Sequence, residues 1–238
     1  MVFHVHLPKP IHGWKMFFNE IAVIAIGILI ALSGEQLLES WREGHTAQKS
    51  FEVIKEEIAL NLGHMQARRD TQNCIDQRLN EIAAYVERPQ ERKRPTWVGR
   101  PQVWNMQTSA VAAARSYGSL TVLPHEDQMA ISTIYGSMAS FEAIEDQEQW
   151  AWAELRSIAE DRDISDSDKA SLRTAIQRAR YAAWRLNTET TEAIQEAQSL
   201  GVAPAKIAKG SKSVCISMDT PFDEAVAKSD MTDLGEPH

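Results

Sequence analysis

Proline is missing from two long stretches of this 238-residue chain, 11–88 and 125–203, although the sequence contains nine prolines. Proline interrupts a helix because it lacks a backbone N–H and its ring clashes with the preceding turn. Glycine, the other poor helix former, occurs only 11 times. We therefore predict an all-α protein whose helices fill both proline-free stretches.

The first of these stretches contains an apolar run, Ile21–Leu32, that no charged residue interrupts. Twelve helical residues span about 18 Å, which is less than the roughly 30 Å of a bilayer's hydrocarbon core. Flanking residues lengthen the helix and supply interfacial anchors, namely Trp14, Phe17, Phe18, Leu38 and Trp41. We predict an N-terminal arm over 1–13 and a transmembrane helix over 14–41, with the lipid bilayer as its partner.

Two other interpretations of the apolar run stay open at this point. Lys9, Lys15 and the sequence Ala31-Leu32-Ser33 loosely fit the basic start and small-residue cleavage site of a secretory signal. A core helix of a soluble protein is the second alternative. Glu20, directly before the apolar centre, is unusual for a signal, and we favour an uncleaved anchor.

One face of the predicted span is rich in small residues. Spacings of four and three place Glu20, Ile24, Gly27, Ala31 and Gly34 on that face, and Gly27 and Ala31 form a small-x-x-x-small pair. Small residues let two helix backbones approach closely in lipid. A carboxylate near the hydrocarbon edge extends to the interface, takes up a proton or finds a partner. We predict self-association through this stripe, or membership of a larger membrane complex.

The N-terminal segment resembles a known family. Gly13-Trp14, Phe17–Glu20, the run Ile21–Leu32 and Glu35-Gln36 are similar to the opening of uncharacterised bacterial single-pass membrane proteins. Residues 104–109 and 112–120 are also similar to a short helix and glycine turn in those proteins. The resemblance implies a location in the bacterial inner membrane, and it implies no catalytic residues.

Orientation in the membrane depends on basic residues. Lys9 and Lys15 precede the span without an acidic neighbour, whereas Arg42 and Lys49 follow it among several glutamates. The two flanks of the span therefore contain equal numbers of Lys and Arg residues, which are the residues that determine orientation. The purely basic start favours an N-terminus inside the cell and a periplasmic body.

The region 42–201 reads as an elongated antiparallel bundle of about four helices. A coiled-coil-like seam of three- and four-residue steps begins at Phe51, has polar residues at Asn61, Arg68 and Gln72, and becomes apolar again from Ile75. We predict one nearly continuous helix from the membrane to about Glu87. A basic, proline-rich linker over 88–101 follows, which we interpret as a solvated connector.

Further helices are expected over 102–117, from Pro124 to about Glu160, and from the start signal at Ser165 to Gly201. Residues 202–238 have no sustained period and are expected to form a disordered tail. Cys74 and Cys215 are expected to be lone thiols, since a bridge between them requires the tail to fold back.

The sequence carries few signs of chemistry. It has no recognisable nucleotide, hydrolase or metal motif, so no metal, cofactor or small-molecule substrate is assigned. We interpret the acidic pairs Glu56-Glu57 and Glu145-Asp146 as solvated. Trp150, Trp152 and Trp184 form either a ligand pocket or, in the interpretation we favour, part of the core. A net charge of −8 argues against nucleic-acid binding.

These observations favour a membrane-anchored helical scaffold or accessory subunit without catalytic activity. The alternative is an extracytoplasmic sensory or ligand-binding bundle.

Overall fold

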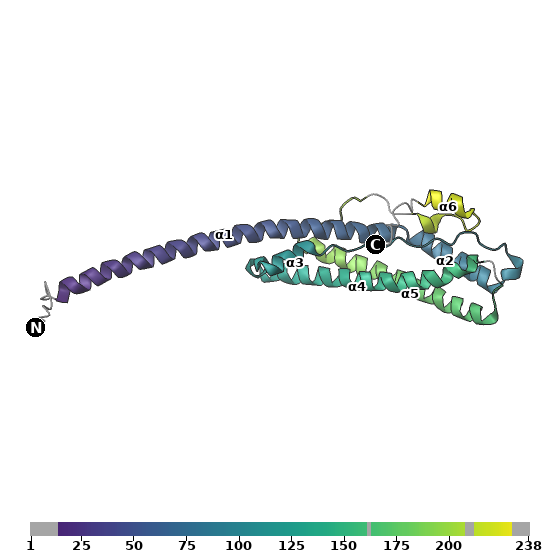
Figure 1. Cartoon of the computed structure of the whole chain (residues 1–238), viewed down its shortest axis with the longest axis horizontal. Coiled ribbons are helices and arrows are strands. Elements are labelled where there is room, and N and C mark those ends of the chain that lie inside the picture. The colour runs from purple at the N-terminus through teal and green to yellow at the C-terminus, as the bar shows by residue number, and fades with distance from the viewer. Residues whose placement is uncertain (1–13, 161–162, 208–211, 230–238) are drawn as a thin grey trace, which may run out of the picture.

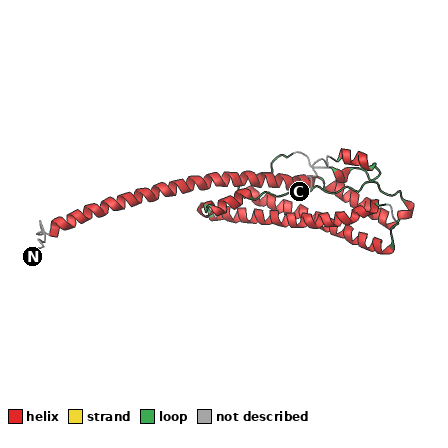
Figure 2. Cartoon of the chain, viewed as in Figure 1, coloured by secondary structure: helices red, strands yellow, loops and turns green. Residues whose placement is uncertain are grey.

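The computed structural model describes residues 14–160, 163–207 and 212–229, and these contain helices and loops but no strand. The all-α prediction is therefore confirmed for them. One long helix projects beyond a helical body, which we define as the described residues from Ala47 onward (Figure 1). Helix dominates the body as well (Figure 2). The predicted arm over 1–13 lies outside the described residues.

Helix α1, Trp14–Asp70, contains 57 residues, and its first buried side chain is Ala47. A short break at Thr71, whose hydroxyl donates to the Arg68 carbonyl over 2.8 Å, separates it from α2, Gln72–Glu87. The predicted continuous helix to Glu87 is thus correct except for this break. The proline-free sequence allows α1 to pass from its exposed half into the body without interruption.

Helices α4, His125–Leu155, and α5, Asp166–Ser199, lie side by side and run in opposite directions (Figure 1). The expected start signal of α5 is a capping box, in which the Ser165 side chain accepts from the Asp168 N–H over 3.2 Å. Gly201, with φ of +69°, follows the end of this helix. A 3-10 turn, η3 (Arg156–Ala159), continues from α4.

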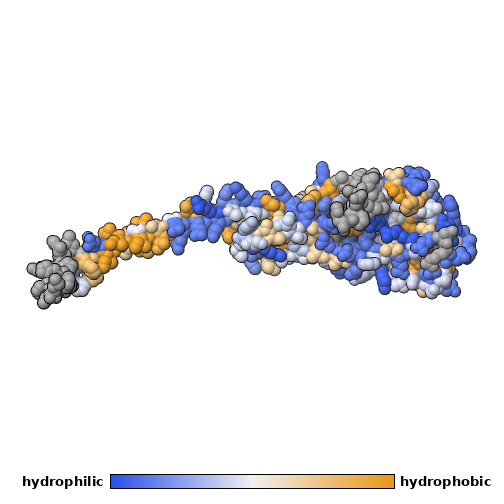
Figure 3. All heavy atoms as spheres, viewed as in Figure 1, coloured by the Kyte–Doolittle hydropathy of each residue, from blue (hydrophilic) through white to orange (hydrophobic). Residues whose placement is uncertain are grey.

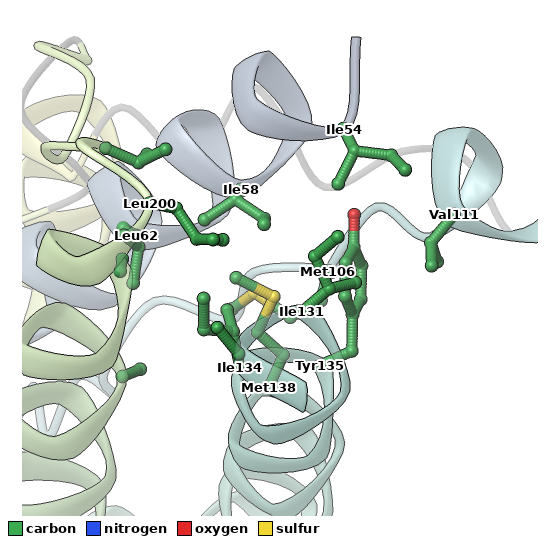
Figure 4. Packing of buried hydrophobic residues seen from close by; sticks show 14 of the residues in the cluster. Ile54, Ile58, Leu62, Met106, Val111, Ile131, Ile134, Tyr135, Met138 and Leu200 are labelled. Carbon is green, nitrogen blue, oxygen red and sulfur yellow. The ribbon is translucent and has the colours of Figure 1, made fainter. Parts of the chain in front are cut away.

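Two apolar cores fill the body. In the first, Ile54, Ile58 and Leu62 of α1 face α4 residues that include Ile131, Ile134 and Met138 (Figure 4). The second core lies between α2, the end of α4 and the start of α5, and Trp152 is its largest fully buried side chain. One face of α5, together with Leu200 at its C-terminal end, is buried: Leu172, Ile176, Ala179, Ala183, Leu186, Ala193, Ala197 and Leu200.

The helix expected over 102–117 is shorter than predicted, because α3 covers only Ser109–Ser116. The preceding backbone bonds to side chains of other helices instead. The N–H of Met106 donates to Glu142 over 2.8 Å, and that of Gln107 donates to Asn61 over 2.9 Å. A 3-10 turn, η2 (Ser119–Val122), then leads into α4.

The linker 88–101 is not a solvated connector throughout. It begins with the 3-10 turn η1, Pro89–Glu91, and continues with Pro95, Trp97 and Val98, which are buried. The N–H groups of Thr96 and Trp97 donate to the Met218 carbonyl over 2.9 and 3.1 Å. This segment therefore packs against the C-terminal part of the chain.

The prediction of a disordered tail is wrong for residues 202–207 and 212–229. The Ala205 N–H donates to the Ala59 carbonyl over 2.8 Å, and a side chain at Gly63 would collide with Ala205. Farther on, the tail forms the 3-10 turn η4 (Ser213–Cys215) and helix α6 (Phe222–Lys228). Specific backbone contacts hold these residues, and such contacts leave no periodic signal in a sequence.

The expectation of lone thiols is also wrong, because Cys74 of α2 and Cys215 of η4 form a disulfide across 141 residues of sequence. The tail does fold back onto α2. Arg78 reinforces this junction, since its guanidinium donates to the carbonyls of Val98 and Ile216.

Candidate functional site

The projecting half of α1 is an apolar helix that nothing in the described chain covers. Its aliphatic side chains from Ile21 to Leu32 are all exposed, and Figure 3 shows them as a hydrophobic band. This is the single helix in the described residues long and apolar enough to cross a membrane. The alternative of a core helix finds no support within one chain, since none of the apolar stretch is buried.

The predicted anchor residues lie at the two ends of this band. Trp14, Phe17 and Phe18 form an aromatic cluster with ring centroids 5.8 to 6.4 Å apart. At the other end, Trp41 is 68% exposed and stacks on His45 at 5.8 Å, and Leu38 is exposed as well. The aromatic rings therefore bracket the apolar band, as in interfacial belts.

The predicted association stripe is open along its whole length. Glu20, Gly27, Ala31 and Gly34 are exposed, and a side chain placed at either glycine would meet nothing within 4 Å. The backbone of α1 is therefore open to a partner at Gly27 and at Gly34 on this face.

The body approaches the end of the apolar band. Tyr117–Val122 pack beside α1, and a hollow of about 670 Å³ lies between that turn and the α1 segment 35–46. Tyr117 is 80% exposed at this tip. We call residues 117–122 the proximal tip.

A charged layer separates the two apolar cores. Arg68 of α1 and Glu148 of α4 form an ion pair at 2.5 Å, with side-chain exposures of 1% and 0%. A second guanidinium nitrogen of Arg68 donates to the other carboxylate oxygen of Glu148 over 3.3 Å. The bidentate geometry satisfies both groups in the interior.

Glu145 and His64 complete this layer. Burial raises the pKa of Glu145 to about 8, the Trp104 N–H opposes the rise by donating over 3.3 Å, and the charge of Glu148 adds to it. His64 stacks on Trp104 at 4.3 Å, and burial lowers its pKa. Each residue thus favours its neutral form.

The interpretation of the acidic pairs as solvated is wrong for one member of each. Glu56 and Asp146 are exposed, whereas Glu57 and Glu145 are buried. The Glu57 carboxylate accepts from the Ser109 hydroxyl at 2.9 Å and the Ala110 N–H at 2.8 Å, at the start of α3. Negative charge stabilises this end of a helix.

The three tryptophans do not form one pocket. Trp152 is buried in the second core, as the interpretation we favoured requires, but Trp150 and Trp184 are 78% and 58% exposed. Trp150 lines an open groove with Tyr181 of α5. The prediction of a core position is therefore wrong for these two residues.

The described residues contain no cluster of three or more His, Cys, Asp or Glu side chains arranged to hold a metal. Comparison with models of protein families, with curated proteins and with solved structures finds no match. Functional inference for this chain therefore depends on its own geometry.

Proposed function

We propose that this chain is a single-pass membrane protein whose helical body acts as a non-catalytic scaffold for protein association at the bacterial inner membrane. The observation that carries the proposal is the continuity of α1. One helix joins an uncovered apolar band to side chains, from Ile54 onward, that are completely buried in the body. A partner held by either part would be fixed relative to the other.

The length of the band supports membrane anchoring. Trp14 and Trp41 are 27 residues apart (41 minus 14), which corresponds to about 40 Å of helix. A bilayer measures roughly 40–45 Å including its headgroup regions. The aromatic clusters would then lie at the two interfaces.

The disulfide supports a periplasmic position for the body. Disulfides persist in the periplasm and are rare in the reducing cytosol. The Cys74–Cys215 bridge therefore favours the same side as the basic N-terminal segment does.

We propose a second copy of this chain as the first partner, held through the stripe of Glu20, Gly27, Ala31 and Gly34. Close backbone approach gives packing energy in lipid, and pairing would give Glu20 polar neighbours. The exposed glycines leave that face accessible to a partner.

Anchoring is tested by washing membrane vesicles that contain the full chain with alkaline carbonate and sequencing the N-terminus of the retained protein. We expect the intact chain to stay in the membrane fraction. Release into the supernatant, or a mature chain that starts after Ser33, would contradict anchoring.

Association is tested by cross-linking the full chain in native membranes. We expect Gly27→Leu with Ala31→Leu to reduce the cross-linked dimer several-fold, because the larger side chains separate the backbones. Ala22→Leu with Ala25→Leu, which also introduces two leucines for small residues but on the opposite face, is the control and should leave the dimer unchanged. Equal dimer in both variants would rule out the stripe.

A further inference from the structure

A cavity of about 370 Å³ opens between the linker, η3, η4 and α6, and α6 lies over the half of the body that is farther from the apolar band (Figure 1). Its wall is mainly apolar and includes Trp97, Val98, Phe222 and Val226. The rings of Trp97 and Phe222 lie 5.8 Å apart. Hydrophobic spheres also gather over α6 in Figure 3. A cavity of this size and composition suits a small organic molecule.

The cavity is built by close contacts between segments that are distant in sequence. The Trp97 indole N–H donates to the Ser213 carbonyl over 2.9 Å. Gly99, with φ of +71°, lies so close to Ser213 that a side chain would be 2.5 Å from the same oxygen. Arg78 of α2 holds these two segments together, since its guanidinium donates to the carbonyls of Val98 and Ile216, and the disulfide ties Cys215 to the same helix.

Two arginines line this apolar wall, Arg100 and Arg156. Within the described part of the chain, neither guanidinium has a carboxylate partner, in contrast to Arg68 and Arg173, which pair with glutamates. Burial, and then the nearby positive charge of Arg100, lowers the pKa of Arg156. Two like charges next to each other leave an excess of positive charge that an anion would neutralise.

The position of the cavity separates it from the membrane. Helix α4 has 31 residues and extends about 46 Å, from the proximal tip to η3 beside the cavity. A lipid headgroup at the end of the apolar band would be too far away to enter. The anion must therefore come from the aqueous phase.

We propose that this cavity binds a water-soluble amphipathic organic anion, with its carboxylate or equivalent group between Arg100 and Arg156 and its apolar part against Trp97 and Phe222. Guanidinium groups bind carboxylates through paired N–H donors. This site goes beyond the scaffold function. The cavity itself does not depend on that function, whereas the exclusion of a lipid ligand rests on the proposed membrane anchoring.

The experiment measures binding of 1-naphthoate to the full chain in lipid nanodiscs by titration calorimetry, with empty nanodiscs as the blank. We expect saturable binding of one molecule per chain. Arg156→Gln and Arg100→Gln should each weaken binding about tenfold, since a hydrogen bond to a charged group contributes about 1.5–3 kcal/mol. Arg115→Gln, an exposed arginine on α3, is the matched control and should bind normally.

The uncharged analogue 1-naphthamide separates charge recognition from apolar adsorption, and it should bind at least tenfold more weakly. No saturable binding, or equal binding of acid and amide in all variants, would overturn the proposal. Circular dichroism checks that each variant is folded. If Arg100→Gln does not fold, the binding measured for Arg156→Gln alone decides the result.

Discussion

Arg68 and Glu148 form a pair whose two charges are almost fully withdrawn from water. The energetic cost of removing charges from water is high, and mutual attraction offsets it only while both partners are present. The stability of the charged layer therefore depends on the pair as a unit.

We predict that Arg68→Met lowers the free energy of unfolding by about 3–5 kcal/mol, because it leaves Glu148 buried without its partner. The double variant Arg68→Met with Glu148→Leu should recover most of this loss. Urea unfolding of the full chain in detergent, followed by circular dichroism, measures both. A double variant as unstable as the single one would show that the apolar pair does not pack in this layer.

The raised pKa of Glu145 leads us to predict that the free energy of unfolding depends on pH. Its folded pKa of about 8 lies above the ordinary value of 4.5, so the folded state holds the proton more tightly than the unfolded state. Its contribution to stability is complete below about pH 4.5 and is lost as pH rises towards 8. Glu145→Gln should remove this decline, which the difference between variant and parent unfolding curves at pH 5 to 8 would reveal. An unchanged decline would contradict the assignment.

The sequence carries a signal for the charged layer that the adjacent acidic pairs do not reveal. Glu145 and Glu148 follow Phe141 by four and seven residues and precede Trp152, so they occupy the same seam of α4. Arg68 occupies the seam of α1. Polar residues at seam positions on two helices predict a buried pair, but which helix faces which depends on three-dimensional packing.

At the scale of elements, helix starts and ends were the most predictable features. Ser165, Pro124 and Gly201 act locally, through the first or last turn of a helix, and the structure has them where the sequence indicated. Residues 102–108 and the tail were not predictable, because side chains and carbonyls far away in sequence hold their backbones. Local preference carries no information about such contacts.

The capping box of α5 gives a prediction at this scale. Ser165→Ala should lower the free energy of unfolding by about 1 kcal/mol, because the Asp168 N–H loses its side-chain acceptor. Thermal unfolding by circular dichroism measures the change. Ser171→Ala, at an exposed position inside the same helix, should have almost no effect. A similar loss in both variants would mean that the cap is not the cause.

At the scale of the whole molecule, the disulfide ties the tail to α2. It also gives a test of the side of the membrane on which the body lies. We predict that a maleimide reagent does not label the full chain denatured directly from native membranes, and that it labels both cysteines after reduction. Labelling without prior reduction would contradict a body in an oxidising compartment. Cys74→Ser should label at Cys215 without reduction and serves as the control for access.

The Cys74–Cys215 disulfide could not be predicted from the sequence alone. Two cysteines permit one bridge, but only the fold of residues 212–229 brings Cys215 to a Cα distance of 5.0 Å from Cys74. The apolar band was predictable because composition alone marks it.

The proximal tip has a geometric consequence for any partner. Tyr117–Val122 lie beside the α1 segment 35–46, where a span that ends at Trp41 would leave the bilayer. In the proposed membrane arrangement, the body would begin at the headgroups, without an intervening stalk, and would extend outwards by about the 46 Å of α4. A membrane-bound neighbour would reach the opposite end only if its own extramembrane part is at least as tall. Height above the bilayer would thus select among neighbours before any surface chemistry does.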